Sequence, residues 1–297
     1  MAWAHVTEKS EEGEPLTSAE QEILEKLQEH IGEEGKKQLT YESQLRYVRG
    51  YAFEAKNGGK EKWLEVAKAE ADKTIKWRKE FDVNHLEVKS VPKWDIWEKS
   101  WPTAVCGTDT HGHPIIVESF KEFNLKELMG NFKAEDIHIY QARNMEGVQR
   151  RKALVSKKLD RLVYKHVYIM DCSGMTMDVL KARAQVQAIF HVAQYYYPES
   201  LWKLFIVNSP LVFRMIWQAS QPFIHPITKA KIKVLSGKGL KELAAGGIPE
   251  SQIPPSLGGT WKPDPEFEAE IQRQVAELSQ EYQSLEASTT PLPSDSA

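Results

Sequence analysis

Apolar residues in the first third of the chain recur at the spacing of amphipathic helices. The positions that would form buried helix faces are Ile23, Leu24, Leu27, Ile31, Leu45, Val48, Ala52, Trp63, Val66, Ala67, Ala71 and Ile75. Apolar residues three or four positions apart share one side of a helix. Thr17, followed by Glu20, is typical of a helix start, and further helices are predicted from near Thr40 and over 60–81. The pattern predicts a small helical lobe over residues 17–92.

The pattern changes after residue 92. Short apolar runs bounded by turn residues are typical of buried strands, and they occur at 113–120, 165–173, 203–209 and 231–236. Between them, helical periodicity extends over about 134–160, 176–196, 210–222 and 238–245. Strands that alternate with helices indicate a mostly parallel sheet covered by helices. We therefore expect an α/β fold for residues 93–262, preceded by the helical lobe.

The two ends of the chain differ in composition from these units. Residues 1–16 are rich in Glu and are predicted to be disordered. A stretch rich in Pro and Gly, 247–265, closes the α/β domain. Residues 263–297 are predicted to form an amphipathic helix, over about 266–287, followed by a disordered acidic tail.

The composition is that of an ordinary globular protein. The 297 residues are 41% hydrophobic and 27% charged, and the formal net charge is −3, which gives no indication of nucleic-acid binding. The amino terminus lacks the pattern of a secretion signal, and no run has the roughly 20 apolar residues of a spanning helix. Cys106 and Cys172 have no metal-binding or CxxC spacing, which favours a reducing, cytoplasmic setting.

Positive charge is concentrated in one part of the chain. Residues 201–241 contain seven Lys or Arg and no Asp or Glu, and five of these lysines lie within 226–241. This basic segment overlaps and extends beyond a strongly apolar stretch, 204–223. A local excess of positive charge predicts a surface that faces anions. The alternative interpretation is a solvated basic face.

The chain contains no recognisable catalytic motif. It has no G-x-S-x-G elbow, no P-loop and no G-x-G-x-x-G. His111 and His113 lie in a segment with Gly and Pro, which favours a turn over a metal site. Cys172 could act as a thiol nucleophile with His166, but a buried structural cysteine is the commoner arrangement. We expect a protein that is not an enzyme and binds no metal.

One long segment, 195–235, reads YYYPESLWKLFIVNSPLVFRMIWQASQPFIHPITKAKIKVL. It contains, in order, Y-Y-P-E, N-x-P and P-F-x-x-P-x-T-x-x-K-I, and a G-G pair follows at 258–259. These elements closely resemble the pattern of the CRAL-TRIO family. Its members are the Sec-fourteen-like transfer proteins for phosphatidylinositol and phosphatidylcholine, and related carriers of tocopherol, retinal or squalene. Upstream, QLRYVRGYAFEA resembles part of the helical lobe of the family.

The resemblance implies a helical lobe followed by an apolar pocket, which has a sheet as its floor and a mobile gate helix as its lid. The gate would be residues 211–223, with Phe213, Ile216, Trp217 and Phe223 as its contacts with the membrane. A fully buried core helix would have the same composition. In members that bind phosphatidylinositol, the head group contacts residues that correspond to Glu199, Thr228 and Lys231. The alternatives are structural: Thr228 as a helix-start hydroxyl, Lys231 as one lysine of many, and Glu199 paired with a nearby base.

The chain departs from the family pattern at positions that bear on the ligand. Tyr51 and Ala52 replace two basic residues of the lobe, one of which contacts the inositol phosphate in other members. His166 and Tyr168 stand where members that bind phosphatidylcholine have small hydroxyl residues, so we expect a remodelled choline site that could hold another lipophile. His166, Tyr168 and Cys172 are also residue types that bind iron, which makes haem an alternative cofactor.

We therefore expect a cytosolic, monomeric protein that binds or transfers lipid, with phosphatidylinositol as its ligand and no other cofactor. The basic segment would bring it into transient contact with anionic membrane surfaces. Two other functions stay open. One is an adaptor that presents its lipid to a lipid kinase or a trafficking partner. The other is an esterase-like α/β enzyme, which the missing nucleophile elbow argues against.

Overall fold

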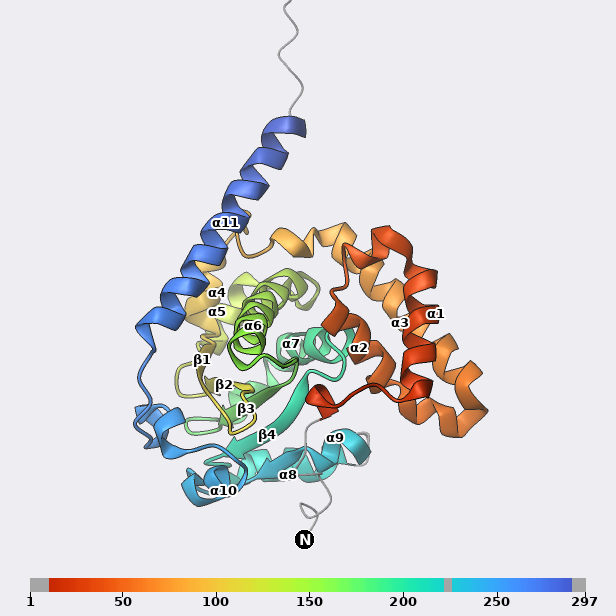
Figure 1. Cartoon of the computed structure of the whole chain (residues 1–297). Coiled ribbons are helices and arrows are strands. Elements are labelled where there is room, and N and C mark those ends of the chain that lie inside the picture. The colour runs from red at the N-terminus through yellow and green to blue at the C-terminus, as the bar shows by residue number, and fades with distance from the viewer. Residues whose placement is uncertain (1–10, 222–225, 290–297) are drawn as a thin grey trace, which may run out of the picture.

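The computed structural model describes residues 11–221 and 226–289. Its amino-terminal lobe contains three helices, which lie together at one side of the molecule: α1 (Ser18–Lys36), α2 (Tyr41–Gly50) and α3 (Ala55–Phe81) (Figure 1). Thr17 and Glu20 form the predicted capping box of α1, and the Thr40 side chain caps α2. The predicted starts of these two helices are thus confirmed.

The helix predicted over 60–81 begins earlier, at Ala55, and the chain kinks within it at Gly58 and Gly59. Gly59 has a φ of 69°, a left-handed value that glycine adopts without steric cost. Beyond the kink, α3 packs on α2, where the indole nitrogen of Trp63 donates to the carbonyl of Val48 at 2.7 Å. The lobe therefore has a core of its own, in which the buried indole nitrogen of Trp63 finds a partner.

A sheet of five strands forms the centre of the larger unit. The strands are β1 (Ala104–Thr108), β2 (Pro114–Ser119), β3 (His166–Asp171), β4 (Leu201–Val207) and β5 (Ile232–Val234). They are hydrogen-bonded in the order β1-β2-β3-β4-β5, with an antiparallel β1–β2 pair and parallel pairs elsewhere. The predicted α/β class with a mostly parallel sheet is thus confirmed. The apolar pattern did not predict β1, a short strand that is largely only half-buried.

The remaining helices connect and cover the strands. They are α4 (Trp94–Ser100), α5 (Leu125–Asn131), α6 (Ile137–Leu159), α7 (Arg183–Tyr196), α8 (Leu211–Ser220), α9 (Pro226–Ala230), α10 (Leu240–Ala245) and α11 (Pro265–Thr289). The four helical patterns predicted after residue 134 correspond to α6, α7, α8 and α10. The long helix predicted near the carboxyl end is α11, which runs along one flank of the molecule (Figure 1).

Each face of the sheet has a separate apolar core. On one face, Met170 and Ile206 pack with residues of α6 and α7, including Ile189 and Val192. On the other face, Ile169 packs with α10 and with the segment rich in Pro and Gly that closes the domain. Because alternate residues of a strand point to opposite faces, the even-numbered positions of β3 face the first core. This face would form the floor of a ligand pocket.

The amino-terminal segment corrects a prediction. Residues 1–16 are expected to be disordered, yet Glu11–Gly13 form a short 3₁₀ helix and the Glu12 side chain is completely buried. The Glu12 carboxylate accepts hydrogen bonds from His113 and from the backbone amides of Tyr164 and Lys165. Local composition could not reveal these donors, because they come from distant parts of the chain. The earlier residues, 1–10, lie outside the described part.

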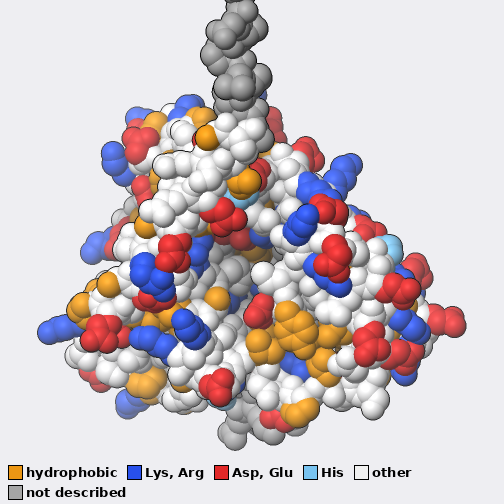
Figure 2. Space-filling view, turned by 45° about the horizontal axis from the view of Figure 1, so that its top comes forward, with side chains coloured by type: hydrophobic (Ala, Val, Ile, Leu, Met, Phe, Trp, Pro, Cys, Tyr) orange, Lys and Arg blue, Asp and Glu red, His pale blue; other side chains and the backbone are white. Residues whose placement is uncertain are grey.

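The surface is mixed in charge. Lys and Arg side chains alternate with Asp and Glu over the face in Figure 2, in keeping with a formal net charge of only −3. Among the described helices, none is both long and apolar enough to cross a membrane.

Candidate functional site

Glu199 is at the centre of a buried ion-pair cluster. It follows α7 in a left-handed conformation, with a φ of 50°, which few residues other than glycine adopt. One of its carboxylate oxygens, Oε1, lies 2.9 Å from Lys165 Nζ and 2.9 Å from Lys231 Nζ. Burial acts to raise the pKa of Glu199, but the two lysines outweigh it and lower that pKa to about 2. The cluster thus has two cationic groups and one permanent carboxylate.

Two of the three residues predicted for a head-group site therefore meet directly. Lys231 follows α9, and its backbone amide donates to the carbonyl of Thr228 at 3.0 Å. Thr228 shares this turn, but its side chain is exposed. The proposed structural alternative for Glu199, pairing with a base, describes its present contacts. A head-group role for Thr228 stays a prediction.

Lys165 is a member of this cluster that sequence reasoning missed. It precedes β3 and is only 3% exposed, with its ammonium 5.6 Å from the centre of the Trp202 ring. Its ammonium also lies 4.0 Å from the Glu11 carboxylate. A single lysine before a strand carries no recognisable motif. The parallel pairing of β3 with β4 brings it beside Glu199.

The helical lobe reaches the same cluster through the end of α2. A Cβ atom built on Gly50 would lie 3.3 Å from the Glu199 Cβ, so the two backbones approach closely. Tyr51, the next residue, stacks on Tyr47 with ring centres 6.3 Å apart. Burial raises the pKa of Tyr51 well above its usual value, so its phenol stays neutral. The predicted ligand contact of Tyr51 stays a prediction.

His166 and Tyr168 share the floor face of β3 but have different surroundings. The Tyr168 hydroxyl donates to the buried Glu118 carboxylate, which also accepts from Thr103 at 2.7 Å. Burial and the Glu118 charge raise the pKa of Tyr168 well above 10. His166 is 6% exposed, and its Nδ1 has no hydrogen-bond partner among the residues that the structure describes.

Cys172 does not join these residues. It follows the carboxyl end of β3, whereas His166 begins the strand, so about 20 Å separate them at roughly 3.3 Å per residue. Burial raises the pKa of the Cys172 thiol to about 12, which keeps it protonated. A thiol–base pair with His166 is therefore wrong, and Cys172 cannot bind the same iron ion as His166.

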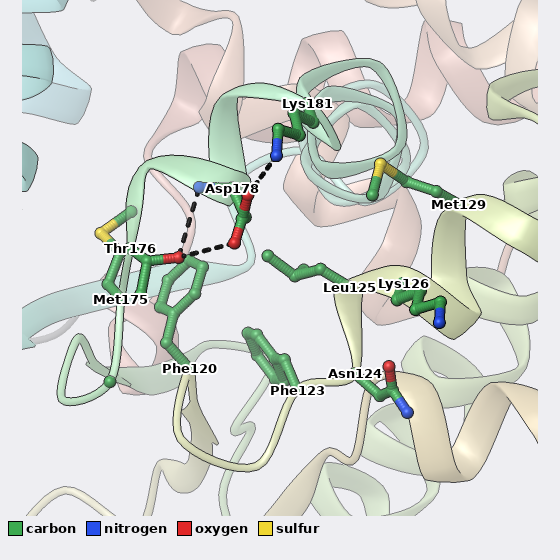
Figure 3. A pocket seen from close by; sticks show the side chains of 11 residues that line it. Phe120, Phe123, Asn124, Leu125, Lys126, Met129, Met175, Thr176, Asp178 and Lys181 are labelled. Atoms are coloured by element: carbon green, nitrogen blue, oxygen red, sulfur yellow. Dashed lines mark hydrogen bonds and ion pairs between the residues drawn. The ribbon is translucent and has the colours of Figure 1, made fainter.

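An apolar pocket of about 560 Å³ lies at the carboxyl ends of β2 and β3. Phe120, Phe123 and Leu125 point toward its interior, with Met129 and Met175 nearby (Figure 3). The rim is polar and includes an ion pair of 2.6 Å between Lys181 and Asp178. The Glu199 cluster lies at the opposite end of the sheet. The sheet face between the pocket and the Glu199 cluster is thus about as long as β3, roughly 20 Å.

Helix α8, the predicted gate, combines half-buried and exposed apolar groups. Phe213 packs against the core on the floor side of the sheet, and its ring is parallel to that of Trp217, with centres 6.4 Å apart. Leu211 and Met215 are 72% and 65% exposed. Phe223 and the side chain of Ile216, also predicted to contact the membrane, lie outside what the structure describes.

The pair His111 and His113 belongs to the turn between β1 and β2. One oxygen of Asp109 accepts from the backbone amides of both histidines, at 2.8 and 2.9 Å, as in an Asx turn. The ring of His113 lies between the Asp109 and Glu12 carboxylates. Potential metal-binding atoms of Asp109, His111 and His113 are within 4.8 Å of one another. The hydrogen bonds that define the turn nevertheless account for this arrangement without an ion.

Comparisons with known proteins point to one family. The model of the CRAL/TRIO domain matches residues 98–259. The SEC14 cytosolic factor of Eremothecium gossypii is 28% identical over 253 residues, which cover 82% of this chain and 77% of that protein. A phosphatidylinositol/phosphatidylcholine transfer protein of Arabidopsis thaliana, SFH14, is 31% identical over 64% of this chain and 34% of its own length. The crystal structure of Sfh5 shares the fold, with a TM-score of 0.55 at 16% identity, over 89% of this chain and 99% of that one.

Proposed function

Because the chain belongs to the CRAL/TRIO domain family, we propose that it encloses one phospholipid, phosphatidylinositol, and exchanges it with membranes without catalysing a reaction. The observation that carries the proposal is the buried cluster of Lys165, Glu199 and Lys231 at one end of an apolar sheet face. The relative from Arabidopsis thaliana that is named as a phosphatidylinositol/phosphatidylcholine transfer protein supports a phospholipid as the ligand. The protein would work as a cytoplasmic monomer that touches membranes transiently.

Lipid carriage requires an enclosed apolar site. A diacyl lipid has some 30 methylene groups, and at about 0.8 kcal/mol each their exposure to water would cost more than 20 kcal/mol. One leaflet forms half of a hydrocarbon core about 30 Å thick, so an acyl chain extends about 15 Å. The floor of the sheet, roughly 20 Å long, is long enough to hold it. Phosphatidylinositol could therefore place its head group at Glu199 and its chain ends near Phe120 and Met175.

The charges in the Glu199 cluster suit an inositol phosphate. Lys165 and Lys231 supply two ammonium groups beside Glu199, and the oxygens of a phosphodiester could accept from them. The Lys231 ammonium and the Thr228 hydroxyl, in one turn, could donate to phosphate oxygens. Glu199 could accept hydrogen bonds from inositol hydroxyls. Phosphatidylcholine fits less well, because Tyr168 and His166 put bulky groups on the floor of the pocket.

Exchange with a bilayer would begin at α8. Leu211 and Met215 expose apolar side chains, and the exposed lysines 229, 238 and 241 follow in sequence. Each lysine near an anionic surface contributes roughly 1 kcal/mol of attraction, and salt screens that attraction. Docking through the lysines would be reversible, and the apolar residues would enter the bilayer while α8 moves.

We expect Met215→Asp to slow transfer of fluorescent phosphatidylinositol between vesicles by about tenfold or more. Burying such a side chain contributes about 1.5–3 kcal/mol, and 1.4 kcal/mol corresponds to a tenfold change. Leu159→Asp is the matched control, because Leu159 is also exposed, at 45%, but lies on α6. Equal transfer by both variants and the unchanged protein would contradict a membrane role for α8.

The same transfer assay separates this proposal from an adaptor function. A protein that only presents its lipid to a lipid kinase or a trafficking partner would bind phosphatidylinositol but would not move it between vesicles by itself. Transfer in the absence of any partner therefore supports carriage.

A second candidate function is the carriage of haem. The observation that favours it is His166, a buried histidine whose Nδ1 has no partner within the described part of the chain, on the same strand face as Tyr168. His and Tyr are residue types that hold haem iron, and these two are only two positions apart. The Tyr168 hydroxyl would first have to leave the Glu118 carboxylate. A Soret band in the absorption spectrum of the purified protein would support this candidate.

A further inference from the structure

Three basic side chains from separate elements are buried beside the Glu199 cluster. They are Arg46 on α2, Lys152 on α6 and His166 at the start of β3, which are 3%, 2% and 6% exposed. Lysine and arginine are almost never fully buried unless they are paired. We refer to these three residues as the buried basic cluster.

Each member of the buried basic cluster has a polar atom that lacks a hydrogen-bond partner among the described residues. The atoms are Arg46 Nε, Lys152 Nζ and His166 Nδ1. An unsatisfied buried polar group costs about 1–3 kcal/mol, and a charged one costs more. Native proteins contain few such groups, so three in one place indicate that a partner for them is missing.

The cluster has a defined geometry. Arg46 donates from its two terminal nitrogens to Ser200 Oγ at 3.0 Å and Ser43 Oγ at 2.8 Å. The carbonyl of Ser200 accepts the backbone amide of His166 at 2.8 Å, which ties Arg46 to β3. These contacts fix the Arg46 guanidinium beside the start of β3, and its Nε has no acceptor among the described residues.

The three groups lie within electrostatic reach of one another. Burial, followed by the charges of Lys152 and Arg46, lowers the pKa of His166 well below 6.5. Burial and the charge of Arg46 also lower the pKa of Lys152 well below 10.5. The Lys231 charge acts on His166 in the same direction, so the buried basic cluster adjoins the proposed head-group site.

The acidic residues around the cluster are already engaged by other partners. Glu146 accepts from Arg78 at 2.9 and 3.0 Å and from the Tyr197 hydroxyl at 2.6 Å. Glu12 is held by His113 and two backbone amides, and Glu199 by its two lysines. Among the described residues, none of these carboxylates accepts a hydrogen bond from Arg46 Nε, Lys152 Nζ or His166 Nδ1, although the charges of Glu12 and Glu146 act to raise the pKa of Lys152.

We propose that Arg46, Lys152 and His166 form a buried binding site for one oxyanion, a phosphate group. The guanidinium Nε–H, the ammonium and the imidazole Nδ1–H can each donate to a phosphate oxygen in a charge-assisted hydrogen bond. The phosphate could be inorganic phosphate from solution or the phosphate of a lipid head group. Only the lipid source rests on the proposed function.

The test is thermal unfolding of the full chain, titrated with inorganic phosphate and with sodium chloride at equal ionic strength. We expect phosphate at about a hundredfold excess over its dissociation constant to raise the Tm by about 5 °C. Lys152→Met should melt higher than the unchanged protein in phosphate-free buffer, because a buried unpaired cation is removed. It should also lose the response to phosphate. Lys56→Met, at an exposed position on α3, is the control and should retain it.

A second measurement does not depend on any variant. The ³¹P resonance of inorganic phosphate should broaden when the unchanged protein is added. If a lipid phosphate can occupy the site, protein that has first been loaded from phosphatidylinositol vesicles should broaden the resonance less. Broadening that persists after loading assigns the site to free phosphate. Loading is measured separately by lipid extraction, so a failure to load counts against the proposed function and not against the anion site.

Two results would overturn the inference. One is a response to phosphate that Lys152→Met retains in full, which would place the anion elsewhere. The other is the absence of any phosphate effect on Tm or on the ³¹P resonance, combined with unchanged phosphatidylinositol loading by Lys152→Met.

Discussion

Lys231→Met is expected to reduce the phosphatidylinositol loaded from vesicles by about 10- to 100-fold while the protein stays folded. A hydrogen bond to a charged group contributes about 1.5–3 kcal/mol, and each 1.4 kcal/mol is a factor of ten in affinity. The fold should persist because Glu199 keeps Lys165 as a partner at 2.9 Å. Methionine also matches the aliphatic part of the lysine side chain and lacks only the ammonium. Loading is measured by extraction of the reisolated protein and mass spectrometry of the lipids.

The choice of variant decides whether a loss of loading can be assigned to the head-group contact. Glu199→Ala would leave the buried Lys165 without its carboxylate, and breaking a buried pair in this way costs about 3–5 kcal/mol. Lost loading in that variant could therefore reflect lost stability. Lys56→Met provides the control for the removal of one positive charge. If Lys231→Met takes up as much phosphatidylinositol as Lys56→Met, the assignment of the head group to Glu199 and Lys231 is contradicted.

Glu12→Gln is expected to lower the free energy of unfolding by about 2–3 kcal/mol, although residue 12 precedes the first long helix. The Glu12 carboxylate is completely buried and accepts from His113 and two backbone amides. A glutamine has no charge, so the charge-assisted hydrogen bonds from His113 and the two backbone amides would be weakened. Urea unfolding measures the change. Glu29→Gln, on the exposed side of α1, is the control and should lie within about 0.5 kcal/mol of the unchanged protein.

The same substitution should change how stability depends on pH. Burial acts to lower the pKa of His113, but hydrogen bonds to Asp109 and Glu12 outweigh it and raise that pKa above 6.5. The folded protein thus binds this proton more strongly than the unfolded chain. This stabilisation is present below about pH 6.5 and is lost as the pH rises through the folded pKa. Glu12→Gln should weaken that loss. An unchanged pH profile and an unchanged unfolding midpoint would show that Glu12 does not hold the amino-terminal segment.

Most of the fold could be predicted from the sequence because its elements follow local rules. The capping box at Thr17 and the apolar runs of β2, β3 and β4 depend only on neighbouring residues. The kink at Gly59 and the short strand β1 were missed, because a glycine pair can break a helix or bend it, and a half-exposed strand lacks a clear apolar run. Disorder was wrongly predicted for Glu11–Gly13, because the partners of Glu12 lie more than a hundred residues away in sequence.

The candidate site could be predicted only where a family pattern linked distant residues. Glu199 and Lys231 are separated by β4, α8 and α9, and the resemblance identified them together before their contact was known. Lys165 belongs to no motif, so its role became apparent only from the pairing of β3 with β4. The separation of Cys172 from His166 follows from strand geometry, and the length of the predicted strand could already have excluded that pair.

The most direct test of the central claim is native mass spectrometry of the purified full chain, with lipid extraction and an absorption spectrum of the same sample. We predict one phosphatidylinositol molecule per chain and no Soret band. A chain that carries haem, another lipophile or no ligand at all, and that takes up no phosphatidylinositol from vesicles, would contradict the proposed function.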